Sequence, residues 1–124
     1  MDKLGIVPRR GDLPVAAFSG GNQQKLLIAK WLVAAPAVLV LHEPTQAVDV
    51  GARRDILRAA REAAAEGTAV VVVSIEPEDL ATICDRVLVI EAGALARELT
   101  GPLSSAQILD AVFHREITVQ EKSR

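Results

Sequence analysis

Apolar residues change their spacing along the chain, and these changes predict helices and strands in alternation. Residues 1–18 show no clear period and are expected to form an irregular lead-in. Leu27, Trp31 and Ala34 then recur at helical spacing, which predicts a helix with one buried face. Residues 38–41 form a short, wholly apolar run, which favours a strand covered on both faces in a parallel sheet.

A second helix and two further strands are expected downstream. Asp49 is placed to cap this helix and Gly67 to end it, because Asp favours helix starts and Gly favours helix ends. The side chains expected on its buried face are Ile56, Leu57, Ala60, Ala63 and Ala64. Residues 70–73 and 87–90 repeat the apolar strand pattern.

Two shorter helices complete the pattern. Pro77 at a first helical position predicts a helix that reaches about Cys84. Residues 92–124 are expected to supply a turn, a last helix and a polar tail, and Ser104 and Gln107 have the spacing of a capping box for that helix. Strands that alternate with helices imply an α/β fold with a mainly parallel sheet and flanking helices.

Composition removes several classes of partner. The 14 Lys and Arg residues nearly balance the 16 Asp and Glu residues, so no broad basic field is available for nucleic acid. The most hydrophobic segment, residues 26–41, is interrupted by Lys30 and Pro36 and is shorter than the roughly 20 apolar residues of a membrane span. No secretory signal is visible. We therefore expect a cytoplasmic chain that does not bind nucleic acid and does not insert into the membrane.

Ser19, Gly20 and Gly21 have the chemistry of an anion site. They open the first predicted helix, where backbone N–H groups and the positive end of the helix dipole are exposed. Ser19 adds a hydroxyl, and a glycine without a Cβ lets a phosphate approach the backbone closely. A Ser-Gly-Gly sequence is also common in plain flexible turns, so the context has to decide between the two interpretations.

Glu43 follows the predicted strand at residues 38–41. It would therefore lie at the C-terminal edge of the sheet, where α/β proteins bind their ligands. A carboxylate at this position can polarise a water molecule. The plainer alternative is an ordinary acidic residue in a turn.

Together these segments resemble the ATP-binding cassette (ABC) ATPases over nearly the whole chain. FSGGNQQK at residues 18–25 matches the signature motif of that family, VLVLHEPT at 38–45 its Walker B strand, and QAVDVGAR at 46–53 its D-loop. The Asn in SGGNQQK, the phrase VDVGAR and CDRVLVIEAG at 84–93 are similar to the C-terminal cassette of ribose, xylose and galactose-type importers.

The resemblance implies that residues 1–124 form the C-terminal part of a nucleotide-binding domain. Its segments would be the lead-in (1–18), the signature motif and helix (19–35), the Walker B strand and D-loop (36–49), a helix with the switch strand and the following strand (50–91), and a turn, helix and tail (92–124).

The resemblance also implies roles for individual residues. The signature residues that would contact ATP held by the opposite cassette are Ser19, Gly20, Gly21, Asn22 and Gln23. Glu43 would be the catalytic base that orients the attacking water. Asp49 would be the D-loop aspartate that links the two nucleotide sites, a role compatible with its capping of the following helix.

Three of the departures of this chain from the family pattern bear on nucleotide and metal binding. The chain contains no G-x-x-x-x-G-K-[ST] segment, so the cradle and lysine for the β-phosphate are not expected in this polypeptide. His42 occupies the position of the Walker B aspartate, and neutral imidazole is a poor substitute for a carboxylate that organises hydrated Mg²⁺. Ile75 occupies the switch position and has no side-chain donor for a γ-phosphate. We expect no metal site in the chain itself and ATP with Mg²⁺ only in a complete assembled site.

The resemblance therefore implies an ATP-binding and ATP-hydrolysing subunit, or a fragment of one, that energises a bacterial sugar importer. The chain would supply its signature motif in trans to another nucleotide-binding domain that carries Walker A, and would lie on the inner face of the plasma membrane through permease subunits. By itself it is expected to be inactive. The alternative is a catalytically inactive half-cassette that acts as a binding or regulatory partner, or the product of a truncated gene.

One consequence concerns the sheet. In the family, the strand that leads into the phosphate loop lies between the strands that correspond to residues 70–73 and 87–90, and this chain has no such strand. Each unmade buried hydrogen bond costs about 1–3 kcal/mol. We expect the two strands either to pair directly or to take the missing strand from a partner, and we favour the partner.

Overall fold

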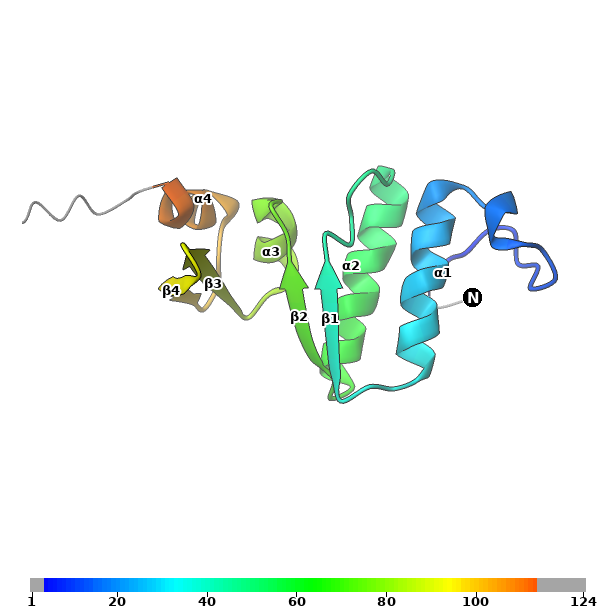
Figure 1. Ribbon diagram of the computed structural model, residues 1–124, viewed down its shortest axis with the longest axis horizontal. Helices are drawn as coiled ribbons and strands as arrows, with labels where there is room; N and C mark the ends of the chain where they lie inside the picture. The colour runs from blue at the N-terminus through cyan, green and yellow to red at the C-terminus, as the bar shows by residue number, and fades with distance from the viewer. Residues whose placement is uncertain (1–3, 114–124) are drawn as a thin grey trace, which may run out of the picture.

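The computed structural model describes residues 4–113, so the predicted polar tail at 114–124 lies outside the described residues. The elements along the chain are η1 (Val15–Ala17), α1 (Gly20–Val33), β1 (Val38–His42), α2 (Val50–Ala65), β2 (Ala69–Val73), α3 (Pro77–Ile83), β3 (Arg86–Glu91), β4 (Ala94–Thr100) and α4 (Ser105–Phe113) (Figure 1). None of the helices between residues 4 and 113 has the length and hydrophobicity of a membrane span.

β1 and β2 form a parallel pair that packs one face against α1 and α2. The register runs from Val38 opposite Ala69 to His42 opposite Val73. Leu39 and Leu41 point to the helices and belong to the same buried cluster as Ile28 of α1 and Ile56 of α2. This arrangement is the strand–helix–strand unit that the apolar pattern predicted.

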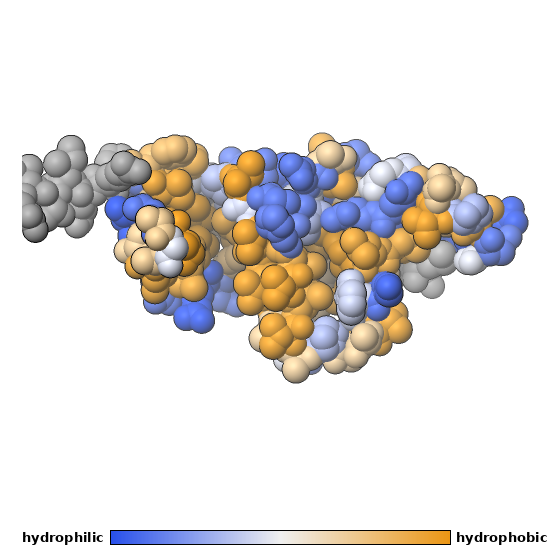
Figure 2. Space-filling view, viewed as in Figure 1, coloured by the Kyte–Doolittle hydropathy of each residue, from blue (hydrophilic) through white to orange (hydrophobic). Residues whose placement is uncertain are grey.

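The opposite face of this pair is bare, so the prediction of strands covered on both faces is wrong for the described chain. Val38 and Val40 of β1 are 58% and 62% exposed, and Val71 and Val73 of β2 are each 48% exposed. Figure 2 shows apolar side chains gathered over this part of the molecule. The continuous apolar run is suited to a second covering layer, which the described residues do not provide.

The predicted period of α1 is confirmed, but its predicted buried face is wrong. Leu27 and Trp31 are each 52% exposed, and the residues of α1 that are buried are Gly21, Lys25 and Ile28. The two exposed side chains line a cavity together with residues of β1, among them Val38 and Val40. They therefore extend the bare apolar surface of the sheet, and periodicity alone could not tell this surface from the core.

α2 matches its prediction more closely. The Asp49 side chain accepts a hydrogen bond of 2.9 Å from the Ala52 N–H, which confirms the expected cap. The predicted face is buried at Ile56, Leu57, Ala60 and Ala63 and half-buried at Ala64. Gly67 follows the helix with a φ of 104°, a conformation that favours glycine.

The C-terminal part contains a strand that was not predicted. β4 pairs with β3 in an antiparallel hairpin, and Ala92 and Gly93, which were expected to form a turn, are its whole loop. Both loop residues have positive φ, as the tight turns of hairpins require. α4 packs on this hairpin through Ile108, which contacts Leu80 and Val87. Among the described residues the strands therefore form one parallel and one antiparallel pair, where the sequence predicted a mainly parallel sheet.

The gap expected between residues 70–73 and 87–90 stays open. Within residues 4–113, β2 bonds only to β1 and β3 bonds only to β4, so the chain has two separate sheets. Direct pairing, one of the two expected outcomes, is therefore wrong for this structure. Dependence on a partner strand stays a prediction.

The lead-in contributes to the core, which its irregular sequence did not indicate. Leu4, Ile6 and Phe18 are all at most 5% exposed and belong to the main buried cluster. A short 3₁₀ turn, η1, precedes Phe18. The segment thus follows no helix or strand period and still packs against α1 and α2, because isolated apolar side chains can anchor a loop without setting a period.

Candidate functional site

The predicted site residues come from one end of the molecule. The C-terminal ends of β1 and β2 and the N-terminal ends of α1, α2 and α3 all lie at the upper end in Figure 1. This follows from the strand–helix alternation: α2 and α3 begin where the parallel strands β1 and β2 end, and α1 runs antiparallel to β1, which follows it. The residues fall into a signature cluster on α1 and α2 and a second cluster around Glu43.

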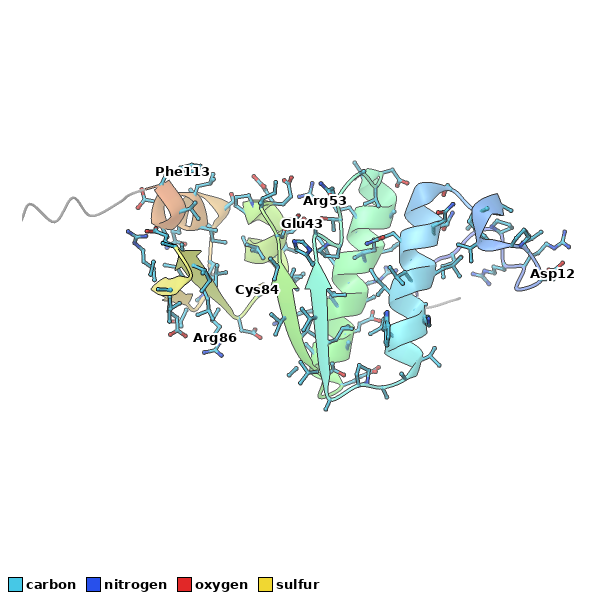
Figure 3. All side chains as sticks on the ribbon, viewed as in Figure 1. Asp12, Glu43, Arg53, Cys84, Arg86 and Phe113 are labelled. Atoms are coloured by element: carbon cyan, nitrogen blue, oxygen red, sulfur yellow. The ribbon has the colours of Figure 1, made fainter. Side chains whose placement is uncertain are left out.

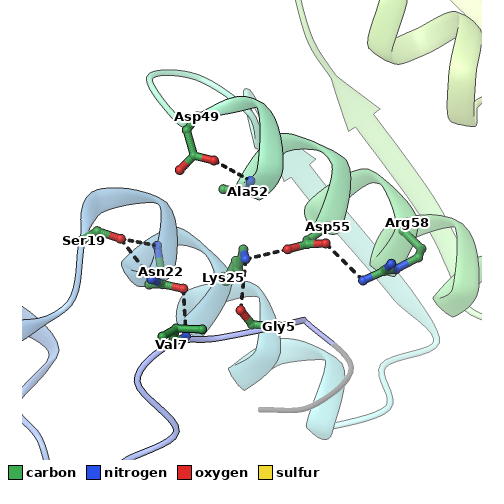
Figure 4. A network of polar contacts seen from close by, with 9 residues as sticks. All are labelled: Gly5, Val7, Ser19, Asn22, Lys25, Asp49, Ala52, Asp55 and Arg58. Atoms are coloured by element: carbon green, nitrogen blue, oxygen red, sulfur yellow. Dashed lines mark hydrogen bonds and ion pairs between the residues drawn. The ribbon is translucent and has the colours of Figure 1, made fainter.

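Ser19 is the N-cap of α1 and is exposed (Figure 4). Its Oγ accepts hydrogen bonds from the Asn22 backbone N–H, with an N–O distance of 3.4 Å, and from the Asn22 side-chain amide at 3.0 Å. The Asn22 side-chain oxygen accepts a hydrogen bond of 3.2 Å from the Val7 N–H. Gln23 donates its amide to the Phe18 carbonyl at 2.8 Å. Asn22 and Gln23 therefore brace the loop before α1, while Ser19 faces solvent.

The two glycines of the signature segment differ in their surroundings. A Cβ added at Gly20 would meet nothing within 4 Å, so an anion has room to approach its backbone. A Cβ at Gly21 would lie 2.9 Å from the Ala52 Cβ and 3.2 Å from an Asp49 carboxylate oxygen. Gly21 therefore allows the starts of α1 and α2 to touch, and the sequence argument, which explained both glycines by phosphate access, missed this packing.

A buried ion pair holds the two helices in this relation (Figure 4). The Lys25 ammonium lies 2.6 Å from an Asp55 carboxylate oxygen, with side-chain exposures of 8% and 17%. Lys25 also donates to the Gly5 carbonyl at 3.3 Å, and Asp55 accepts from Arg58 at 3.1 Å. Removing one partner of such a pair would leave an uncompensated buried charge. Sequence alone gave no sign of it, because Lys25 and Asp55 are 30 residues apart.

Asp49 connects this cluster to the D-loop. Its carboxylate caps α2, and the hydrogen bond from the Ala52 N–H holds the pKa of Asp49 below its ordinary value. Asp49 therefore stays ionised beside Gly21 at neutral pH. The structure thus brings together the two segments that the resemblance assigned to contacts between cassettes.

Glu43 lies immediately beyond β1 and is half-buried. Its backbone N–H donates to the Val73 carbonyl at 2.8 Å, and its Oε1 accepts a hydrogen bond of 3.0 Å from the Ile75 N–H. The Ile75 side chain is 80% exposed. The switch position therefore reaches Glu43 through its backbone, a contact that an argument from side-chain donors could not find.

His42 is exposed on the bare face of β1 and lines the cavity there, which has a volume of about 370 Å³. Mg²⁺ prefers several oxygen ligands in octahedral geometry. The neighbouring carboxylate of Glu43 is the only one that follows β1 directly, and no cluster of three or more His, Cys, Asp or Glu able to hold a metal occurs among residues 4–113. The donor set of the described chain therefore does not fit Mg²⁺.

A buried polar group on α3 was missed by the sequence argument. Asp79 of α3 accepts hydrogen bonds from the Thr45 hydroxyl at 2.5 Å and from the Arg53 Nε at 2.6 Å. The bond to Asp79 raises the pKa of Arg53 above its ordinary value. In Figure 3, Glu43 and Arg53 are labelled at the same end of the β1–β2 pair.

Comparisons with known proteins agree with this architecture. The chain is similar to the cassette MJ0796 in its dimeric crystal structure, with 25% identity and a TM-score of 0.68 over 80% of this chain and 43% of that one. A second structure of MJ0796, bound to ADP and Pi, gives a TM-score of 0.69 at 24% identity, over 80% of this chain and 43% of that one. The fold is thus a partial ABC ATPase fold, of the P-loop NTPase kind.

Curated sequences give the relationship more closely. The chain is 51% identical over 89 residues to the ribose import ATP-binding protein RbsA of Ruegeria sp., which covers 72% of this chain and 17% of that protein. It is 49% identical over 113 residues to a putative ribose/galactose/methyl galactoside import ATP-binding protein of Rhizobium meliloti, covering 90% and 23%. With the uncharacterised ABC transporter ATP-binding protein YphE of Escherichia coli it shares 38% identity over 113 residues, covering 91% and 22%.

The chain therefore belongs to the ABC ATPases, where it corresponds to the C-terminal part of a cassette. Within that family its relatives include ATP-binding proteins of sugar importers. It spans about a fifth of the length of the curated relatives it matches. No protein-family model matches the chain.

Gly21→Ala should destabilise the chain, whereas Gly20→Ala should not. The new Cβ at position 21 would press on Ala52 and Asp49, and overpacking of this kind costs about 1–3 kcal/mol. Position 20 is open, so the matched variant should change stability by less than about 0.5 kcal/mol. Urea unfolding followed by circular dichroism measures both. Equal midpoints for the two variants would contradict the packing role of Gly21.

Proposed function

We propose that the chain is part of an ATP-binding and ATP-hydrolysing subunit that energises a bacterial sugar importer. The observation that carries the proposal is the exposed N-terminus of α1, where Ser19 faces solvent and Gly20 leaves room beside its backbone. Such a terminus binds anions through backbone N–H groups and the helix dipole. The relatives named for ribose import support the choice of sugar transport.

Ser19, Gly20 and Gly21 act on ATP bound by a partner nucleotide-binding domain. The triphosphate supplies the anionic γ-phosphoryl group, and the Ser19 hydroxyl and the first N–H groups of α1 donate hydrogen bonds to it. Because Ser19 Oγ already accepts from Asn22, its own O–H is available as a donor toward solvent. Asn22 and Gln23 contribute by holding this loop.

Glu43 is the catalytic base in this proposal. Oε1 is occupied by the Ile75 N–H, so the second oxygen is the one available to orient a water molecule. A hydrogen bond from a backbone amide fixes the carboxylate without neutralising it. Asp49, ionised beside Gly21, relays the position of the signature segment to the loop that begins at Glu43.

The partners follow from what the chain contains. A second nucleotide-binding domain supplies the Walker A loop, and permease subunits hold the assembly at the inner face of the plasma membrane. The bare apolar face of β1 and β2, and the edges of β2 and β3 that no strand within residues 4–113 pairs, favour a further partner segment that completes the sheet. ATP and Mg²⁺ are bound only in that complete assembly.

Ser19→Ala should slow ATP hydrolysis in an assembly of this chain with a cassette that carries Walker A. Loss of one donor to a developing charge costs roughly 10²-fold in kcat. Ser104→Ala is the matched control, because Ser104 has the same N-terminal hydrogen-bonding role before α4, with its Oγ accepting from the Gln107 N–H.

The chain alone should show no ATPase activity and no micromolar affinity for Mg-ATP in calorimetry, since positioning and charge neutralisation both require missing parts. Tight binding of Mg-ATP by the chain alone, or equal rates for the Ser19 and Ser104 variants in the assembly, would contradict the proposal.

His42 favours a second candidate function, a catalytically inactive half-cassette that binds or regulates a partner. The imidazole stands where a carboxylate would organise Mg²⁺. The two candidates differ in what restoring the carboxylate does.

His42→Asp should raise Mg²⁺-dependent turnover only when the assembly also contains a Walker A loop, and should have no effect in the chain alone. His42→Asn is the control, because it matches the size of Asp without its charge. The measurement is steady-state ATP hydrolysis against Mg²⁺ concentration. If the His42 chain and the Asp variant hydrolyse ATP equally well in the assembly, this account of position 42 is wrong.

A further inference from the structure

Asp79 is the most deeply buried of the charged side chains among residues 4–113, with an exposed fraction of 2%. A buried carboxylate is tolerated only when donors satisfy it. Here the donors come from two other elements, the Thr45 hydroxyl at 2.5 Å and the Arg53 Nε at 2.6 Å. Asp79 therefore joins α3 to the loop after β1 and to the first turn of α2.

The loop held in this way carries the proposed catalytic base and the D-loop aspartate. It runs from residue 43 to residue 49, so Glu43 lies at its start and Asp49 at its end. Glu43 and Ala47 have φ values of 47° and 56°. Residues other than glycine keep such positive φ values only when the surrounding structure holds them there. Thr45 lies between Glu43 and Ala47 in the sequence.

A reciprocal contact joins the same two regions from the other side. Glu43 Oε1 accepts from the Ile75 N–H at 3.0 Å, and Ile75 belongs to the loop that leads from β2 into α3. Thr45 in turn donates to Asp79, within α3. Two hydrogen bonds thus join the loop after β1 to the segment after β2. The proposed catalytic carboxylate of Glu43 accepts one of them.

We propose that Asp79 is a positioning residue that sets the course of loop 43–49 and thereby holds the Glu43 carboxylate against the Ile75 N–H. Its importance for catalysis rests on the proposed function of Glu43. The geometry that Asp79 maintains does not rest on that function, because the bonds from Thr45 to Asp79 and from Ile75 to Glu43 both lie within the chain itself. Loss of the Thr45 hydroxyl leaves the buried carboxylate with Arg53 alone and frees the loop.

A purely structural role for Asp79 would make a different prediction. If Asp79 only anchored α3 to the core, breaking its bond to Thr45 would raise the exchange of amides throughout the chain. A positioning role raises exchange at Ile75 more than elsewhere, because the Ile75 side chain is exposed and its amide is protected by Glu43. The informative quantity is therefore the exchange rate of the Ile75 amide divided by that of the buried α2 amides.

The test compares Thr45→Val, which removes the hydroxyl and keeps the shape, with Thr45→Ser, which keeps the hydroxyl. Hydrogen exchange is measured on the full chain by mass spectrometry with single-residue fragmentation, and Glu43→Ala calibrates the loss of protection at Ile75. Hydrogen bonds to charged groups are strong enough that Thr45→Val should raise the ratio about tenfold. Thr45→Ser should leave the ratio near its original value.

An unchanged ratio in Thr45→Val, or an equal rise in both variants, would overturn the proposal in favour of packing. If Thr45→Val does not fold, Arg53→Met breaks the other bond to Asp79 at a position whose side chain is 36% exposed. The same rise is expected there, and no rise would overturn the proposal. The measurement needs no nucleotide, so failure of the proposed ATPase function would leave this result unaffected, and the reverse also holds.

Discussion

Backbone N–H and C=O groups in a sheet must find partners, and this requirement governs the rest of the molecule. β1 and β2 satisfy each other, as do β3 and β4, but the edges of β2 and β3 have no described strand beside them. Val71 and Val73 are exposed next to one of these edges. Unpaired edges and a bare apolar face are liabilities in an isolated domain. We propose that the same features form an interface with a further strand and its covering layer.

Polar contacts hold the elements together near the C-terminal ends of β1 and β2. The pair of Lys25 and Asp55 fixes α1 against α2, and Gly21 permits the close contact with Asp49 that this arrangement demands. Asp79 ties the loop after β1 to α2 and α3 through Thr45 and Arg53. The candidate site is therefore built from contacts within the described chain, although we propose that its ligand is held by another domain.

Much of the fold could be predicted because local chemistry decides it. Asp49 caps α2 through its own side chain, and a continuous apolar run such as residues 38–41 favours a strand. The misassigned face of α1 had another cause. Leu27 and Trp31 are as apolar as core residues, and only the arrangement of the sheet determines that nothing described here covers them.

The sequence proposes residues for the candidate site, and their roles stay predictions, but it does not indicate their contacts. Ser19, Glu43 and Asp49 follow from motif and position. The hydrogen bonds from the Ile75 backbone to Glu43 and from Thr45 to Asp79 join elements about 30 residues apart. A single sequence carries no signal for such pairings.

The central claim is that one edge of β2 has no partner strand within the described chain. Hydrogen exchange along β2 tests this claim most directly. The Ala69 N–H and the Val73 carbonyl both face the β1 side, so by strand alternation the amides of Val70 and Val72 point to the open edge. In the chain alone, the account predicts fast exchange at Val70 and Val72 and slow exchange at Val71. Adding the segment that precedes the matched region in a related ribose import ATP-binding protein should protect both fast amides and raise the melting temperature. Val70 and Val72 amides as well protected as that of Val71 in the chain alone would contradict the account.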